Sequence, residues 1–136
     1  MPPDVASAPA SGNIARLEPN EIFVFGSNEA GQHGGGAALQ AHFQFGAELG
    51  CGEGLTGQSY AFPTLDANLK QLPWRSLVDA RDRLYWACVQ NFETRFLLTK
   101  VGCGIAGYEE DRMRSLFRNP PANLILPADW EAQLCR

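Results

Sequence analysis

Short apolar runs alternate along the chain with longer segments in which apolar and polar residues are mixed. The apolar runs are nearly continuous, as in strands that are buried on both faces of a parallel sheet. The predicted strands are Glu21–Phe25, Gln58–Phe62, Phe96–Val101 and Asn123–Leu126. Pro63 follows the second strand and Pro127 follows the fourth, and we expect each proline to end its strand.

The longest mixed segment predicts a helix from Pro73 to Asn91. Proline suits the first turn of a helix, where its missing N–H has no intrahelical partner to lose. After this proline, apolar residues recur at a spacing near that of a helical turn and form one stripe. The stripe comprises Trp74, Leu77, Val78, Leu84, Tyr85, Cys88 and Val89.

Two shorter segments also have helical character, and they are Ala37–Phe45 and Glu109–Arg118. Gly46 follows the first and is the expected helix stop. Leu39 and Phe43 lie four residues apart in it, so we expect them to share a buried face. The second carries acids in its first turn and arginines in its last, which complements the helix dipole.

The predicted order is strand, helix, strand, helix, strand, helix, strand. This alternation predicts an α/β domain of three layers, with a largely parallel central sheet flanked by helices. A chain of 136 residues fits a single core. Residues 1–13 are rich in Pro, Ala, Ser and Gly and read as a disordered lead-in, so residues 14–136 form the predicted domain. Gly50–Gly57 reads as an irregular loop, and the tail after Pro127 as one more turn around Trp130.

A glycine-rich loop joins the first predicted strand to the first helix. It contains Gly26, Ser27, Asn28, His33, Gly34, Gly35, Gly36 and Ala37. Three consecutive glycines at a helix start leave backbone N–H groups bare and close to any ligand, and the helix dipole adds partial positive charge. These features favour an anion, most often a phosphate. The loop is not of the nucleotide-triphosphatase type, because no Lys-Ser or Lys-Thr pair follows its glycines.

A second glycine loop follows the third predicted strand. It comprises Gly102, Cys103, Gly104, Ile105, Ala106, Gly107 and Tyr108. In open α/β sheets, ligands bind outside the carboxyl ends of the strands. Because both loops follow strands, we expect them to face each other across one crevice.

Composition narrows the possible partners and the cellular setting. The net charge of −4 gives no basic footprint for nucleic acid or an anionic membrane, and no apolar run approaches the length of a membrane span. The four cysteines have no C-x-x-C spacing and only two histidines are present, so we expect no metal site and no cofactor. The first residues do not resemble a signal peptide. We therefore expect a cytoplasmic protein with free thiols, and its oligomeric state stays open.

The two loops together resemble the signature of macro domains. In that family an Asn after a strand precedes a glycine-rich loop and a helix start, as Asn28 precedes Gly34–Gly36 here. The segment Gly102–Tyr108 resembles the family's phosphate loop, and its Gly-Cys-Gly form is closer to the branch that removes ADP-ribose from proteins and nucleic acids. The similarity covers Ile22 to Pro127 and extends to small macro-like proteins of bacteriophages and bacteria.

This resemblance implies that ADP-ribose or a related nucleotide diphosphate binds in the crevice. Asn28 would contact the distal ribose, and the first loop would lie near that ribose and the phosphates. The second loop would hold the diphosphate. The implied ligand-binding residues are Gly26, Ser27, Asn28, Gly34, Gly35, Gly36, Ala37, Gly102, Gly104, Ile105, Ala106, Gly107 and Tyr108. The chain departs from the hydrolytic branch at Ala106, where that branch carries an Asp, and from the family in having no early Asp to hold the adenine amine.

Three residues are candidates for catalysis, and each has a structural alternative. Asn28 would hold a water beside the ligand, or would cap a turn. His33, which we expect to be exposed, would pair with phosphate or act as an acid or base, or would be a solvated loop residue. Cys103 would be a nucleophile with His33 as its base, although a small buried residue under the loop is the better interpretation. Tyr108 would stack on a base or ribose, or cover the edge of the core.

Three hypotheses about function remain open from the sequence. The chain could be a binding module that reads ADP-ribose marks. It could be a hydrolase that cleaves an ADP-ribosyl bond or a terminal phosphate, chiefly by positioning a water. It could also be a partner-binding protein that has no nucleotide ligand.

Overall fold

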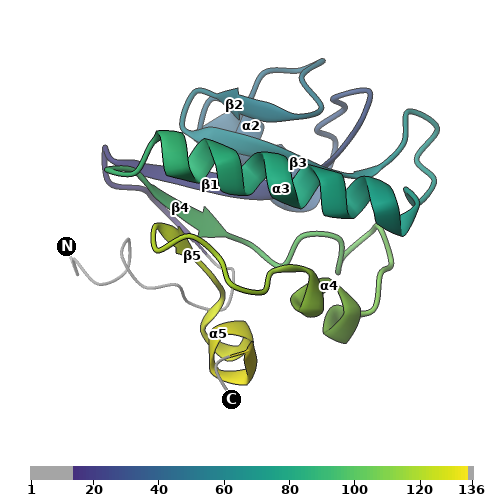
Figure 1. Ribbon diagram of the computed structural model, residues 1–136. Helices are drawn as coiled ribbons and strands as arrows, with labels where there is room; N and C mark the ends of the chain where they lie inside the picture. The colour runs from purple at the N-terminus through teal and green to yellow at the C-terminus, as the bar shows by residue number, and fades with distance from the viewer. Residues whose placement is uncertain (1–13, 135–136) are drawn as a thin grey trace.

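The computed structural model describes residues 14–134, which form a five-stranded sheet with helices on both faces (Figure 1). The predicted lead-in and Cys135 lie outside the described residues. The elements in chain order are β1 Glu21–Asn28, α2 Gly36–Gln44, β2 Gly54–Thr56, β3 Ser59–Leu65, α3 Trp74–Gln90, β4 Arg95–Leu98, α4 Glu110–Leu116, β5 Leu124–Ile125 and α5 Ala128–Leu134.

The sheet is largely parallel, as the alternating pattern predicts. Its strand order is β2-β3-β1-β4-β5. The central strand β1 pairs in parallel with β3 and β4, and β4 pairs in parallel with β5. The short strand β2 is antiparallel to β3 and forms one edge.

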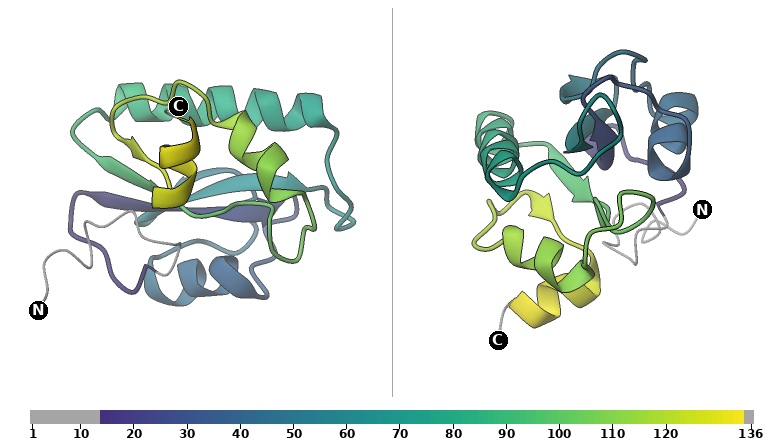
Figure 2. Two further views of the ribbon diagram at one scale, coloured as in Figure 1. Left: turned by 90° about the horizontal axis from the view of Figure 1, so that it is seen from below. Right: turned by 90° about the vertical axis from the view of Figure 1, so that its right-hand side faces the viewer.

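Two apolar clusters, one on each face of the sheet, make up the core. Phe23 and Phe25 of β1 pack beneath α2, whereas Val24 between them belongs to the cluster that contains α3, α4 and α5 residues. The views in Figure 2 show α2 on one side of the sheet and α3, α4 and α5 on the other. This alternation explains why residues 22–25 of β1 are all apolar, since both faces of the strand are buried.

Several strand predictions are wrong. β1 continues beyond Phe25 to Asn28, and β4 ends at Leu98 rather than at Val101. β3 continues through Pro63 to Leu65, because β2 pairs only with residues 59–61 and the missing N–H of Pro63 therefore costs no ladder bond on that side. The predicted loop 50–57 contains β2, a three-residue strand that is too short and glycine-rich to give an alternating pattern.

Two predictions of buried side chains are also wrong. Leu39 and Phe43 lie on the outer side of α2, where Phe43 is 76% exposed, while the residues of α2 that are buried are Ala38 and Ala41. Small side chains on the inner side let the helix lie close to the phenylalanines of β1. On α3, Val89 is exposed although the predicted stripe included it.

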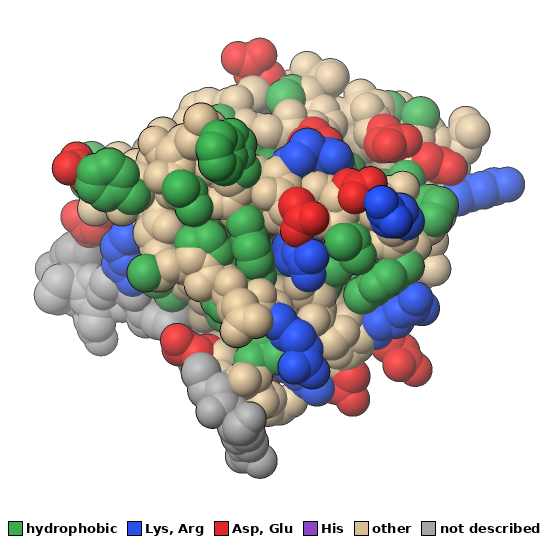
Figure 3. Space-filling model, in the orientation of Figure 1, with side chains coloured by type: hydrophobic (Ala, Val, Ile, Leu, Met, Phe, Trp, Pro, Cys, Tyr) green, Lys and Arg blue, Asp and Glu red, His purple; other side chains and the backbone are tan. Residues whose placement is uncertain are grey.

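The face that carries α3 has mixed chemistry. Figure 3 shows acidic, basic and hydrophobic side chains interspersed over this face. Oppositely charged residues are paired there, for example Arg83 of α3 with Glu53 in the loop before β2, and Arg114 with Asp111 in α4. This visible face therefore presents no continuous basic surface.

Candidate functional site

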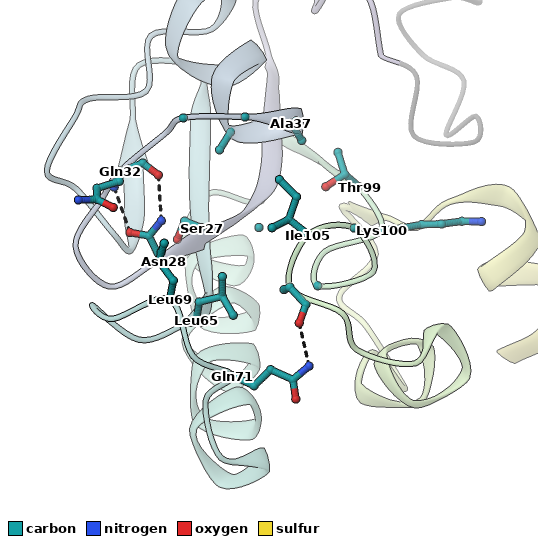
Figure 4. A pocket seen from close by; sticks show the side chains of 18 residues that line it. Ser27, Asn28, Gln32, Ala37, Leu65, Leu69, Gln71, Thr99, Lys100 and Ile105 are labelled. Carbon is teal, nitrogen blue, oxygen red and sulfur yellow. Dashed lines mark hydrogen bonds between the residues drawn. The ribbon is translucent and has the colours of Figure 1, made fainter.

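A cavity of about 550 Å³ opens where β1, β3 and β4 end. Both glycine loops line it, as the sheet topology predicts. The end of β1, the first loop and the start of α2 contribute Gly26, Ser27, Asn28, Gln32, Gly34, Gly35, Gly36, Ala37 and Ala38. The second loop contributes Gly102, Gly104, Ile105 and Ala106. Figure 4 shows these residues around the opening, with side chains from the β3–α3 connection on another wall.

The two loops approach each other closely at their bases. A Cβ added to Gly26 would lie 3.3 Å from the backbone nitrogen of Gly102. Gly102 has a φ of +79°, and a Cβ there would lie 3.0 Å from Met113 and from Tyr108. Glycine at position 26 therefore allows the loops to lie close together, and glycine at position 102 allows the second loop to pack against Met113 and Tyr108.

Backbone N–H groups of both loops are free to donate to a ligand. Within residues 14–134, no backbone acceptor is found for the N–H groups of Gly34, Gly35, Gly104, Ile105 and Ala106. The first three N–H groups of α2, a helix of nine residues, also lack backbone partners, as is general at helix starts. The α2 dipole adds partial positive charge at the same wall. Residues of both loops that line the cavity thus have N–H groups without a backbone acceptor within residues 14–134.

Asn28 caps a turn, which was the structural alternative for this residue. Its Nδ2 donates to the carbonyl of Gln32 at 2.9 Å, and its Oδ1 accepts from the N–H of Gln32 at 3.0 Å (Figure 4). The side chain is 8% exposed and lines the cavity. The two hydrogen bonds fix its orientation at the wall, next to the free N–H groups of the loop.

The hydroxyl groups around the cavity brace its walls. Ser27 donates to the carbonyl of Gly52, and Thr99 donates to the carbonyl of Val24 at 2.8 Å. Gly52 has no room for a side chain, because a Cβ there would lie 2.5 Å from the carbonyl oxygen of Asn28. The segment before β2 is therefore packed tightly against the first loop.

Tyr108 supports the second loop from outside the cavity. Its hydroxyl donates to the carbonyls of Thr64, at 2.7 Å, and Leu72, at 3.1 Å. The ring packs against the apolar cluster under α3. Tyr108 and Gly107 are not among the lining residues, so Tyr108 adopts the second of its two predicted roles, that of covering the core edge.

His33 is buried, so the prediction that it is exposed is wrong. It is 3% exposed, its Nε2 is 2.9 Å from the carbonyl oxygen of Glu48, and its ring packs edge-on against Phe25. Its Nδ1 is buried, and no hydrogen-bond partner for it is found within residues 14–134. A histidine among glycines gave no sign that the segment before β2 would fold over it.

Cys103 lies under the second loop rather than in the cavity wall. Its thiol donates to the carbonyl of Val101, and its side chain packs with the cluster on the α3 face. Phe25, which His33 contacts, belongs to the cluster on the opposite face. Burial raises the pKa of the Cys103 thiol to about 11, so the thiol is protonated at neutral pH. The structure thus does not bring Cys103 and His33 together as a nucleophile and base.

Lys100 lines the cavity, but its ammonium group forms ion pairs with Glu110 and Asp129. Its Nζ lies 2.9 Å from a carboxylate oxygen of Glu110 and 2.8 Å from one of Asp129. These hydrogen bonds, first that to Asp129, raise the pKa of Lys100. Trp130 also donates to Glu110, at 2.9 Å. In Figure 4 the Lys100 side chain extends away from the opening.

Sequence reasoning missed one wall of the cavity. Leu65, Leu69 and Gln71, from the end of β3 and the connection to α3, line it on the side away from β4. Gln71 donates through Nε2 to the carbonyl of Ala106 at 2.7 Å and so joins this wall to the second loop. Asp66 in this connection is of a type that favours an ordered turn, because an aspartate side chain can accept hydrogen bonds from N–H groups a few residues further on.

Comparison with known proteins finds no matching family model, no similar curated protein and no similar solved structure. Within residues 14–134, no helix has the length and hydrophobicity needed to cross a membrane. The same residues contain no cluster of three or more His, Cys, Asp or Glu side chains that could hold a metal ion.

Proposed function

We propose that this protein binds ADP-ribose or a related nucleotide diphosphate in the cavity between the two glycine loops. The observation that carries the proposal is that residues of both loops line one cavity and have N–H groups without a backbone acceptor within residues 14–134. Such groups bind phosphate oxygens without a bulk positive charge, which agrees with the net charge of −4. The cavity of about 550 Å³ lies in the size range of small-molecule sites.

Binding without catalysis is the form of this function that the cavity supports best. Among the described residues that line the cavity, Lys100 has the one ionisable side chain, and Glu110 and Asp129 already bind it. Asn28 is the candidate catalytic residue that does line the cavity, and Gln32 holds both ends of its amide. The described residues that line the cavity therefore include no free general acid or base for a bound ligand.

Hydrolysis by positioning alone remains the second candidate function. In it, the loop N–H groups, Asn28 and the ligand's own phosphates would hold a water next to an ADP-ribosyl bond or a terminal phosphate. The observation in its favour is the fixed orientation of the Asn28 amide at the wall of the cavity. This candidate predicts that Asn28→Ala abolishes turnover.

Calorimetric titration tests the proposal. We expect ADP-ribose to bind to the purified protein more tightly than ADP, because the distal ribose would contact the wall formed by Asn28 and the first loop. Incubation of ADP-ribosylated protein with an excess of the chain then distinguishes a reader from a hydrolase. Failure of ADP-ribose, ADP and ribose 5-phosphate all to bind would contradict the proposal and favour a partner-binding protein.

A further inference from the structure

Two exposed aliphatic side chains lie on different walls at the mouth of the cavity. Ile105 of the second loop is 87% exposed, and Leu69 of the β3–α3 connection is 55% exposed. Both line the cavity, with the partly exposed Leu65 close to Leu69 (Figure 4). The Cδ1 atom of Ile105 lies 3.6 Å from the position that a Cβ on Gly35 would take, so Ile105 reaches toward the first loop. The mouth thus carries aliphatic side chains next to the loops whose N–H groups lack a backbone acceptor.

The backbone holds Leu69 in a conformation that leucine disfavours. Its φ is +64°, and within residues 14–134 Asn119 is the other non-glycine residue with a positive φ. The Asp66 carboxylate maintains the turn by accepting from the N–H groups of Asn68, at 2.8 Å, and Lys70, at 3.0 Å. Asparagine or glycine adopts this conformation with less strain than leucine. The turn therefore places a leucine at the cavity where the backbone alone would favour another residue.

One side-chain donor near this end of the cavity is already committed. Gln71 uses its amide nitrogen to bind the carbonyl of Ala106. Among the described lining residues there is no Asp or Glu that could accept a hydrogen bond from the amino edge of a nucleobase. Apolar contact is therefore the chief interaction that Leu65, Leu69 and Ile105 offer to a ligand.

We propose that Leu65, Leu69 and Ile105 form an apolar subsite that holds the faces of a nucleobase next to the anion site and accepts different bases. This inference rests on the proposed function, because the base belongs to the nucleotide whose phosphates occupy the loops. Burial of exposed aliphatic surface against a flat ring is favourable. Every base has such a face, so contact with the face does not select among bases.

The test compares two ligands and four proteins by calorimetric titration. The ligands are ADP-ribose and its analogue with hypoxanthine in place of adenine, which changes the hydrogen-bonding edge and keeps the flat ring. The proteins are the wild type, Leu69→Asn, Ile105→Ala and the control Leu49→Asn. Leu49 is 63% exposed in a turn and does not line the cavity, so it matches Leu69 in type and exposure.

We expect the wild type to bind both ligands with affinities within about threefold, because Leu65, Leu69 and Ile105 would contact the face of the base and not its edge. Leu69→Asn and Ile105→Ala should each weaken both ligands by about tenfold through lost apolar contact. Leu49→Asn should change neither affinity. The thermal midpoint of Leu69→Asn should equal or exceed that of the wild type, since asparagine relieves the strain at this φ.

Any of three results would overturn the subsite while leaving the proposed function intact. The first is wild-type affinity for ADP-ribose in both cavity variants, and the second is discrimination between the two bases by more than about threefold. A fall in the thermal midpoint of Leu69→Asn would assign Leu69 a structural role and would equally contradict the inference. If the wild type binds neither ligand, the subsite and the proposed function are both wrong.

Discussion

Individual glycines of the two loops have different physical roles. Gly26 and Gly102 are required by close approach, since a Cβ at either would meet neighbouring atoms at 3.3 Å or less. A Cβ at Gly34 or Gly104 would meet no atom of residues 14–134 within 4 Å, and both residues line the cavity. The first pair shapes the backbone, whereas the second leaves space that a ligand could fill.

Gly34→Val should separate binding from folding. The added side chain enters open space next to the free N–H groups, so we expect the thermal midpoint to stay within about 3 °C of the wild type and ADP-ribose binding to fall below detection. Gly52→Ala is the contrasting variant, because its Cβ would lie 2.5 Å from a carbonyl oxygen. Gly52→Ala should lower the thermal midpoint of unfolding. A Gly34→Val protein that binds normally would show that the ligand does not lie over this loop.

Cys103 gives a prediction about the chemistry of the site. Because the thiol is protonated at neutral pH and packs under the loop, Cys103→Ser should not change turnover if the protein proves to be a hydrolase. Alkylation by iodoacetamide, followed by mass spectrometry, should modify Cys103 slowly at pH 7 and faster as the pH approaches 11. Rapid modification at pH 7, together with lost turnover in the serine variant, would restore the nucleophile hypothesis.

Connections between elements hold the second loop in place. Tyr108 ties it to the end of β3, Gln71 ties it to the connection before α3, and Lys100 ties the end of β4 to α4 and α5. The loop thus depends on elements that come from three separate parts of the chain. Such contacts between distant segments leave no periodic signal in the sequence.

Tyr108→Phe should loosen the second loop without unfolding the core. It removes a hydroxyl that donates to the carbonyls of Thr64 and Leu72, and we expect a loss of about 1 kcal/mol in the free energy of unfolding. Urea denaturation measures the loss, and ADP-ribose affinity should fall only modestly because the ring does not line the cavity. An affinity loss of a hundredfold with unchanged stability would instead indicate direct stacking on the ligand.

The ion pairs of Lys100 predict a dependence of stability on pH. Hydrogen bonds from Lys100 lower the pKa of Glu110 and of Asp129 below their ordinary values, with a further contribution from Trp130 at Glu110. For carboxyls with lowered pKa, the stabilisation is present above the unfolded pKa of about 4 and is lost as the pH falls through the folded value. Because these groups are partly exposed, the contribution is below about 1 kcal/mol.

Lys100→Met provides the measurement of this dependence. At pH 7 and pH 5 we expect the variant to be less stable than the wild type in urea, and the difference should shrink below about pH 4 as the carboxylates are protonated. A difference that stays constant from pH 7 to pH 3 would mean that the ion pairs contribute nothing and that the lysine stem stabilises by packing alone.

At the scale of the whole molecule, the last described segment closes the core on the α3 face. Trp130 of α5 is fully buried, stacks near Phe117 and donates to Glu110. Trp130→Ala should lower the free energy of unfolding by about 3–5 kcal/mol, as for large buried aromatic residues elsewhere. Thermal unfolding followed by circular dichroism would detect this loss, and a change of under about 1 kcal/mol would show that α5 is peripheral to the core.

The sequence predicted the fold class better than the walls of the site. Continuous apolar strands such as β1 and the long amphipathic helix α3 carry strong local patterns, so their existence and order were predictable. The burial of His33 could not be predicted, because it depends on contact with the segment before β2, and that segment has no periodic hydrophobic pattern. The wall that contains Leu69 was missed for the same reason, since its turn is fixed by side-chain hydrogen bonds of Asp66.

Amide chemical-shift mapping tests the central claim most directly. In spectra of the ¹⁵N-labelled protein, addition of ADP-ribose should shift the amide resonances of both loops most strongly, above all Gly34, Gly35, Gly104 and Ile105, because their N–H groups would donate to the ligand. Shifts in both loops at one common affinity would support a single anion site between them. An unchanged spectrum, or shifts confined to residues outside the cavity, would contradict the account.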